Sequence, residues 1–276
     1  MSKVRSGKKL GAWYLLAVVL LRPWLLLLTR RDWHGAAQLR AEVRDDGTQE
    51  GVVVCPNHIS WFDPLESAHF LYDNGRPPRY LGKEAVFRIP VIGRIIRGAG
   101  QIPVYRETVD AANAVRDAIA AVERGECVVV YPEGTITRDP DLWPMTGKTG
   151  AARIALTTGA PLIPLAQWGA QDVIGPYRKE LRLLPRKTMR VRAGEPVDLS
   201  DLRGRPLDSA TLHEATDRLM AAITALLEGI RGQTAPVQRY DLKAHRTPSD
   251  DGGTTGPGAI GEGTTGEGTT DEGRDG

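Results

Sequence analysis

The alternation of β-rich runs and helical patterns is the feature that most constrains this fold. From Gly51 onward, short runs rich in β-branched residues alternate with longer segments whose apolar positions recur at helical spacing. The strand candidates are residues 51–55, 127–131, 162–167 and 189–193, and the helix candidates are residues 110–124, 151–158 and 209–231. Strands that alternate with helices predict a sheet covered by helices, the α/β class.

Charge divides the chain into a basic body and an acidic tail. The formal net charge is +2, but residues 248–276 hold one Arg and seven Asp/Glu, a net −6, which leaves +8 on the rest. A basic body favours anionic partners such as phospholipid surfaces, nucleotides or nucleic acids, without choosing among them. The two cysteines, Cys55 and Cys127, each stand in an apolar run. We expect both to be buried thiols in a reducing compartment.

The first 40 residues combine positive charge with an apolar run. They hold eight Lys/Arg and one Asp, and residues 10–21 carry no charge before Arg22-Pro23 interrupts the run. Residues 24–28 are again apolar, and no small-residue cleavage site follows. We expect residues 1–40 to be a membrane anchor, embedded or re-entrant, with Trp13, Tyr14, Trp24 and Trp33 at headgroup level. A single tilted span, a signal peptide and a buried helix are the alternatives.

The C-terminal tail has the composition of a disordered segment. Residues 247–276 contain mostly Gly, Thr, Asp and Glu, and a Gly-Glu-Gly-Thr-Thr pentapeptide occurs twice. Such a segment lacks the large apolar residues that a core needs, so we expect a disordered tail. Residues 41–240 remain for the folded domain.

A histidine and an aspartate follow the first predicted strand. His58 and Asp63 are five residues apart, which on a regular helix would separate them by about 140°. A contact therefore requires a turn, which Pro56 and Pro64 favour. A histidine held by a carboxylate presents its other ring nitrogen as a general base, here for a substrate hydroxyl. Taken alone, the pair is also explained by an ordinary strand-end hydrogen bond of His58.

Two further polar blocks also follow apolar runs. Arg106 ends the run 100–106, where a guanidinium can bind a phosphate, and residues 128–131 lead into Pro132-Glu133-Gly134-Thr135. Ligands of open α/β sheets bind at strand ends, so these blocks predict one shared site. A surface ion pair of Arg106 and a turn or capping role of Glu133 are the alternatives.

Four blocks in this order resemble the phospholipid/glycerol acyltransferases, in particular the 1-acylglycerol-3-phosphate acyltransferase branch. They are Asn57-His58-x4-Asp63, residues 100–106, residues 132–135 and residues 160–164, and the resemblance covers residues 51–196. It implies a mixed sheet flanked by helices, as in glycerol-3-phosphate acyltransferase. It also implies that His58 is the general base and that Asp63 orients it.

The resemblance also implies the binding residues. Arg106 and Glu133, with Gly134 and Thr135, would form the pocket for the acceptor phosphate and glycerol, and Lys83 would help to hold the phosphate. Residues 161–164 would shape the acyl-donor side. Two departures bear on the acceptor: Tyr131 replaces the usual Phe, and Ile136 stands where Arg is usual, with Arg138 two positions later.

The implied reaction moves a fatty acyl group from a thioester to the sn-2 hydroxyl of lysophosphatidic acid, which gives phosphatidic acid. It needs no metal or cofactor, and acyl-CoA or acyl-carrier protein would be the donor. We expect association with the cytoplasmic face of the plasma membrane and no nucleic-acid partner, because the chain has no recognisable nucleic-acid-binding module. Another acceptor, such as glycerol-3-phosphate or another lysophospholipid, and a non-catalytic lipid-binding protein are the alternatives.

A second basic stretch lies late in the domain. Residues 178–192 hold seven Lys/Arg and one Glu, interleaved with Leu181, Leu183 and Leu184. A solvated pair of strands, a ledge that faces lipid and a dock for acyl-carrier protein are all consistent with this pattern.

Overall fold

The computed structural model describes residues 10–40, 49–104, 108–178, 180–242 and 244. The chain divides into two units, Met1–Leu242 and Lys243–Gly276. The first unit holds every helix and strand described below. The predicted disordered tail and the basic residues 1–9 lie outside the described residues.

Seven strands form one mixed sheet in the order β1-β7-β6-β2-β5-β3-β4. Every neighbouring pair is parallel except β6 and β7, which are antiparallel. The strands are β1 (Thr29–His34), β2 (Val52–Pro56), β3 (Pro78–Lys83), β4 (Ile102–Val104), β5 (Cys127–Val129), β6 (Leu162–Trp168) and β7 (Lys187–Ala193).

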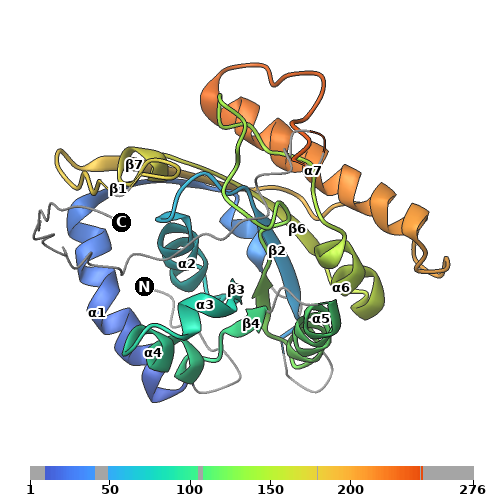
Figure 1. The fold of residues 1–276 in the computed structure, drawn as a ribbon, viewed down its shortest axis with the longest axis horizontal. Coiled ribbons are helices and arrows are strands. Elements are labelled where there is room, and N and C mark those ends of the chain that lie inside the picture. Colours follow the sequence, from blue (N-terminus) through green and yellow to red (C-terminus); the bar gives the residue numbers. More distant parts are fainter. Residues whose placement is uncertain (1–9, 41–48, 105–107, 179, 243, 245–276) are drawn as a thin grey trace, which may run out of the picture. The chain divides into compact units, whose positions relative to one another are not determined.

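Helices cover both faces of the sheet (Figure 1). Alternate strand residues point to opposite faces, so Val53 and Cys55 pack with α5, α6 and α7, whereas Val52 and Val54 pack with α2. The α-helices among the described residues are α1 (Ala12–Leu28), α2 (Asp63–Asp73), α3 (Glu84–Phe87), α4 (Ile92–Gly98), α5 (Thr108–Glu123), α6 (Gly150–Thr158) and α7 (Ser209–Arg231). The two 3-10 helices are Ala36–Leu39 and Ala170–Asp172.

The predicted α/β class with a mixed sheet is confirmed. The four predicted strands correspond to β2, β5, β6 and β7, and the three predicted helices correspond to α5, α6 and α7. Cys55 and Cys127 are free and buried, as expected. Strands β1, β3 and β4 and helices α2, α3 and α4 were not predicted. Strand β4 has only three residues, and the polar β1 lies at the sheet edge, where alternation is weak.

The N-terminal segment contributes a helix and a strand. Helix α1 continues through Pro23, where the apolar run was expected to be interrupted, and β1 follows it directly. One side of α1 packs on the domain through Leu25, through the Tyr14–Tyr72 ring contact and through Arg22, which binds the Asp73 carboxylate with two hydrogen bonds. Among the helices described, none is both long and apolar enough to cross a bilayer.

Candidate active site

The C-terminal ends of neighbouring parallel strands create the site. Strands β2, β5, β3 and β4 run parallel in this order, so the segments that follow them emerge at one edge of the sheet. His58 follows β2, Glu133 follows β5, and Lys83 ends β3. The fold therefore brings three predicted site residues, separated by up to 75 positions, to one edge.

His58 and Asp63 form the hydrogen-bonded pair that the sequence predicts. His58 Nδ1 lies 2.9 Å from Asp63 Oδ2, and the same oxygen accepts the backbone N–H groups of Ile59 and Ser60 at 2.6 and 2.8 Å. Asp63 is the first residue of α2, so the turn before this helix wraps around its carboxylate. Because Asp63 accepts from Nδ1–H, the lone pair of the neutral imidazole is on Nε2.

The two members of the pair differ in burial. Asp63 is completely buried, whereas the His58 side chain is 13% exposed and within reach of a small group from solvent. Burial raises the pKa of Asp63, and the hydrogen bonds from His58 and from two backbone N–H groups lower it in opposition. The hydrogen bonds of Asp63 thus hold the turn and the imidazole in place.

Glu133 holds the backbone of the histidine turn. Its side chain is 2% exposed; Oε1 accepts the backbone N–H of His58 at 2.9 Å, and Oε2 accepts that of Met145 at 3.0 Å. Burial raises the pKa of Glu133 to about 8, although these N–H groups lower it. Both Glu133 oxygens are therefore engaged by backbone N–H groups, one of which belongs to His58. The contact of Glu133 with a substrate, which the family resemblance implies, stays a prediction.

Tyr131 supports the imidazole ring from one side. The rings of His58 and Tyr131 stack with centroids 4.2 Å apart and planes at 27°. The Tyr131 hydroxyl lies 3.2 Å from Ser67 Oγ, which is also 2.8 Å from the Tyr80 hydroxyl. Burial raises the pKa of Tyr131, so the phenol is neutral. The sequence showed Tyr131 only as a departure from the family pattern, because stacking across two strands has no linear signal.

Gly134 and Thr135 continue the same turn. Gly134 has φ +72°, a left-handed conformation that favours glycine. A Cβ at this position would lie 2.7 Å from Lys148 Nζ, so the lysine side chain lies directly over the glycine backbone. Thr135 is partly exposed beside it. Sequence reasoning missed Lys148 as a residue of this site, although the structure places its side chain against the turn.

The remaining predicted cations occupy different positions. Lys83 is exposed at the end of β3 and pairs in register with Val104 of β4. Arg106 lies outside the described residues, two positions beyond Val104. The Arg138 guanidinium lies over the Tyr177 ring at 5.8 Å, while Ile136 is buried. The Arg138 side chain therefore points toward the ring of Tyr177.

Asn57 has a structural function. Its side-chain oxygen accepts the backbone N–H of Gln167 at 2.8 Å, its amide donates to the Gln167 carbonyl, and the Gln167 side chain donates to the Asn57 carbonyl. These three bonds join the ends of β2 and β6 directly before His58. They fix the position from which the turn that carries His58 starts.

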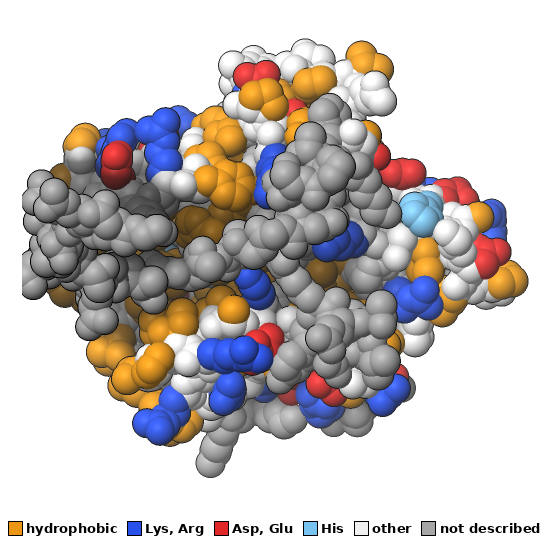
Figure 2. All heavy atoms as spheres, in the orientation of Figure 1, with side chains coloured by type: hydrophobic (Ala, Val, Ile, Leu, Met, Phe, Trp, Pro, Cys, Tyr) orange, Lys and Arg blue, Asp and Glu red, His pale blue; other side chains and the backbone are white. Residues whose placement is uncertain are grey.

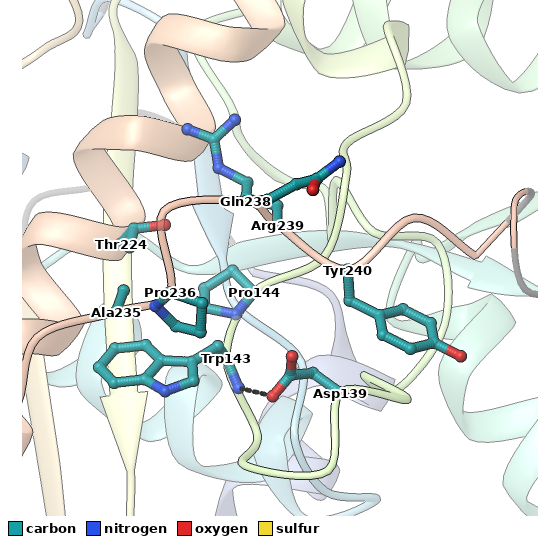
Figure 3. A pocket seen from close by; sticks show the side chains of 9 residues that line it. All are labelled: Asp139, Trp143, Pro144, Thr224, Ala235, Pro236, Gln238, Arg239 and Tyr240. Atoms are coloured by element: carbon teal, nitrogen blue, oxygen red, sulfur yellow. Dashed lines mark hydrogen bonds between the residues drawn. The ribbon is translucent and has the colours of Figure 1, made fainter.

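The close-up in Figure 3 shows a separate pocket, lined by residues of the loop 139–144, by Thr224 of α7 and by the segment 235–240. It contains none of the predicted site residues, and its volume of about 10 Å³ accommodates about one water molecule. Thr146 N–H donates to the Tyr240 carbonyl at 3.0 Å, so this region fastens the C-terminal segment to the loop that carries Met145.

The arrangement as a whole is an imidazole oriented by a buried carboxylate at the strand edge of an α/β sheet. Residues 30–168, about half of the chain, match the family model called Acyltransferase, and the chain belongs to this family. Within those residues lie His58, Asp63 and Glu133.

Named relatives and a solved structure are similar to this chain. The chloroplastic 1-acyl-sn-glycerol-3-phosphate acyltransferase BAT2 of Brassica napus is 30% identical over 123 residues, 44% of this chain and 34% of that protein. The enzyme of the same name from Borreliella burgdorferi is 30% identical over 125 residues, 45% and 48% of the two chains. The chain thus spans half or less of these two relatives.

A bacterial relative and a crystal structure are matched over longer stretches. The 1-acyl-sn-glycerol-3-phosphate acyltransferase of Bacillus subtilis is 26% identical over 181 residues, 66% of this chain and 80% of that one. The crystal structure of PlsC, the 1-acyl-sn-glycerophosphate acyltransferase of Thermotoga maritima, aligns with a TM-score of 0.55 and 20% identity over 78% of both chains. This likeness shows a shared fold.

Proposed function

We propose that this chain is a 1-acylglycerol-3-phosphate O-acyltransferase. The observation that carries the proposal is the His58–Asp63 pair, 2.9 Å apart at the strand edge, in a chain of the acyltransferase family. The curated relatives that match carry this activity in their names. The substrates would be a fatty acyl thioester, from acyl-CoA or acyl-carrier protein, and lysophosphatidic acid.

The reaction is a direct transfer in which His58 is the base. The sn-2 hydroxyl oxygen of the acceptor attacks the thioester carbonyl while Nε2 of His58 takes its proton. The C–S bond then breaks, and the leaving thiolate is protonated. Asp63 stabilises the imidazolium and keeps Nδ1 protonated, and Tyr131 limits ring rotation. No covalent acyl-enzyme and no metal are needed in this scheme.

The acceptor phosphate would bind where cations meet the site edge. Lys83 ends β3, and Lys148 lies over Gly134 on the other side of the β5 turn. Arg106 follows β4 in the sequence. A phosphate bound by these cations would lie beside a glycerol hydroxyl that faces His58. Ile136 stands where the family pattern has Arg, so glycerol-3-phosphate is a second candidate acceptor.

Membrane association would present the lipid acceptor to this site. Helix α1 packs on the domain by one side and exposes eight large apolar side chains elsewhere: Trp13, Leu15, Leu16, Val19, Leu20, Leu21, Trp24 and Leu27. Such a helix is suited to lie in the interface of a leaflet, and we place it at the cytoplasmic face of the plasma membrane.

An acceptor series tests the function. Thiol release from acyl-CoA is measured with membrane-bound protein and lysophosphatidic acid, glycerol-3-phosphate or lysophosphatidylcholine. We expect release that depends on lysophosphatidic acid. Release with glycerol-3-phosphate alone would move the assignment to the second acceptor, and no release with any acceptor, from either acyl-CoA or acyl-carrier protein, would contradict an acyltransferase.

A further inference from the structure

Two short helices beside the site edge carry an exposed apolar tip. Helix α3 begins at Glu84, directly after Lys83, and residues 88–91 join it to α4. Phe87 is buried and anchors the tip, and Gly93 lies so close to the Phe87 carbonyl that no Cβ would fit there. The outward apolar side chains of this tip are Val86, Ile89, Val91 and Ile92.

The apex of the tip is held in a rare backbone conformation. Ile92 N–H donates to the Pro90 carbonyl at 2.7 Å, and Val91 between them has φ 65° and ψ −59°. This is the strained form of the γ-turn, and it is unfavourable for a β-branched residue. The Val91 side chain is nevertheless 66% exposed, so it contributes little to the core in return. Strain of this kind is retained at binding surfaces more often than in ordinary loops.

Arginines surround the apolar tip. Arg88, Arg94 and Arg97 line a groove of about 380 Å³ together with Phe87, Ile89, Pro90 and Val91. Arg88 pairs with Glu84, whereas among the described residues Arg94 and Arg97 have no carboxylate partner. The segment 84–98 thus carries one acidic and three basic side chains. An exposed guanidinium beside aliphatic side chains complements a surface that is both apolar and anionic.

The tip is continuous with the apolar side of α1. Helix α4 packs on α1, and Gly98 is close enough to the Trp13 ring that a side chain at position 98 would collide with it. In Figure 2, hydrophobic and Lys/Arg side chains lie side by side over the area where Figure 1 places α1 and α4.

We propose that the α3–α4 tip is a second membrane contact, in which Ile89, Val91 and Ile92 enter the interface of an anionic bilayer while Arg94 and Arg97 bind lipid phosphates. A single helix in the interface leaves the domain free to rotate about the helix axis. A second contact removes that freedom. Because α3 starts at the end of β3, this contact fixes the site edge relative to the leaflet. The inference goes beyond the proposed reaction, since vesicle binding requires no turnover.

A bilayer explains the tip better than a protein partner does. An acidic carrier protein would complement the arginines, but it would not require four aliphatic side chains on a protruding turn. Inserted aliphatic residues with cationic side chains at the rim are what an interfacial lipid contact requires.

A fluorophore at the apex tests the insertion. Cys55 and Cys127 are buried, so Val91→Cys in the full chain provides the accessible thiol for an environment-sensitive dye. We expect a blue shift and quenching by acyl-chain-brominated lipid on phosphatidylcholine vesicles that contain phosphatidylglycerol. The matched control is Leu207→Cys, an exposed leucine before α7, which should not respond. Unchanged emission of the Val91 probe on bound protein would overturn the proposal.

Charge variants test the headgroup contact. Arg94→Gln with Arg97→Gln should weaken binding to phosphatidylglycerol vesicles about thirtyfold, and Arg203→Gln, an exposed arginine far along the chain, should leave it unchanged. Turnover in detergent micelles should stay at the wild-type value, so a failure of the proposed reaction is seen separately. Retained vesicle binding with weakened binding to acyl-carrier protein would overturn the membrane contact in favour of a protein dock.

Discussion

The turn that carries His58 and Asp63 differs from the exposed surface of α1 and the α3–α4 tip in how its side chains are held. In the turn, Asp63 Oδ2 accepts three hydrogen bonds and both oxygens of Glu133 accept backbone N–H groups. On the surface, large apolar side chains stand exposed, and Arg88, Arg94 and Arg97 line a groove beside them. A proton transfer needs one geometry, and the side chains of His58, Asp63 and Glu133 are each held by hydrogen bonds. Membrane contact needs only an apolar and cationic composition on one side, and tolerates freedom within it.

The largest effect should come from the base itself. His58→Ala removes the proton acceptor, and turnover should fall by about 10² to 10⁴ in micelles and on vesicles alike. The side chain is partly exposed and its backbone N–H remains bound to Glu133, so the thermal midpoint should stay near the wild-type value. Unchanged turnover in this variant would show that the turn is structural only. Trp61→Ala, which alters an exposed side chain in the same turn, is the matched control.

The buried carboxyl group of Glu66, which contacts Trp33 of β1, should make the free energy of unfolding depend on pH. Glu66 accepts a hydrogen bond from Trp33 Nε1 at 2.9 Å, and burial raises its pKa to about 7 from 4.5. Between these two pH values Glu66 keeps its proton in the folded protein and loses it in the unfolded chain. The contribution of protonated Glu66 to the free energy of unfolding is therefore fully present below pH 4.5 and is lost as the pH rises to about 7. The loss is on the order of 3 kcal/mol.

Glu66→Gln tests this titration, because the amide does not ionise. The variant should show a flatter slope of unfolding free energy between pH 5 and about 7 than the wild type. An equal slope in both proteins, measured by urea unfolding, would show that Glu66 is not the group that titrates.

A substitution on the exposed side of α1 should weaken vesicle binding and leave turnover unchanged, the opposite of a substitution at His58. Leu20→Asp removes an apolar side chain from the interface, so vesicle affinity should fall by about ten- to a hundredfold. Turnover in micelles and the thermal midpoint should not change, because Leu20 contributes little to the folded core. A lowered midpoint would mean that this side of α1 packs within the protein.

The smallest effect should come from the hydroxyl of Tyr131. Tyr131→Phe keeps the ring that stacks on His58 and loses the hydroxyl contacts with Ser67 and Gln167, so turnover should change by no more than about threefold. Tyr131→Ala removes the ring and should cost more than Tyr131→Phe. Equal values for the two variants would show that stacking does not position the base.

The two regions also differ in how far the sequence predicted them. The His58–Asp63 contact was predictable because two prolines and a preceding β-branched run indicate a turn at a strand end. The clasp of Glu133 on two backbone N–H groups and the Tyr131 stack were not, because they join segments 75 and 73 positions apart that only the strand order brings together. Strands β3 and β4 escaped prediction for a related reason: their pairing with β5 and with each other, more than their own sequence pattern, defines them.

The sequence predicted the apolar and basic composition of the N-terminal segment, but it did not predict which other residues share its exposed surface. The apolar run and the basic residues of 1–40 indicated a membrane-associated segment, whereas β1 within it belongs to the sheet. The α3–α4 tip gave no signal, because four apolar residues spread over seven positions become one surface only when the γ-turn at Val91 folds them outward.

The most direct measurement compares lysophosphatidic acid with its analogue that lacks the sn-2 hydroxyl, using wild-type protein on vesicles and acyl-CoA as donor. If His58 deprotonates that hydroxyl, phosphatidic acid forms from the first acceptor, and the second gives neither product nor thiol release above background. Thiol release at the same rate with both acceptors would mean that water accepts the acyl group, and the protein would then be a thioesterase and not an acyltransferase.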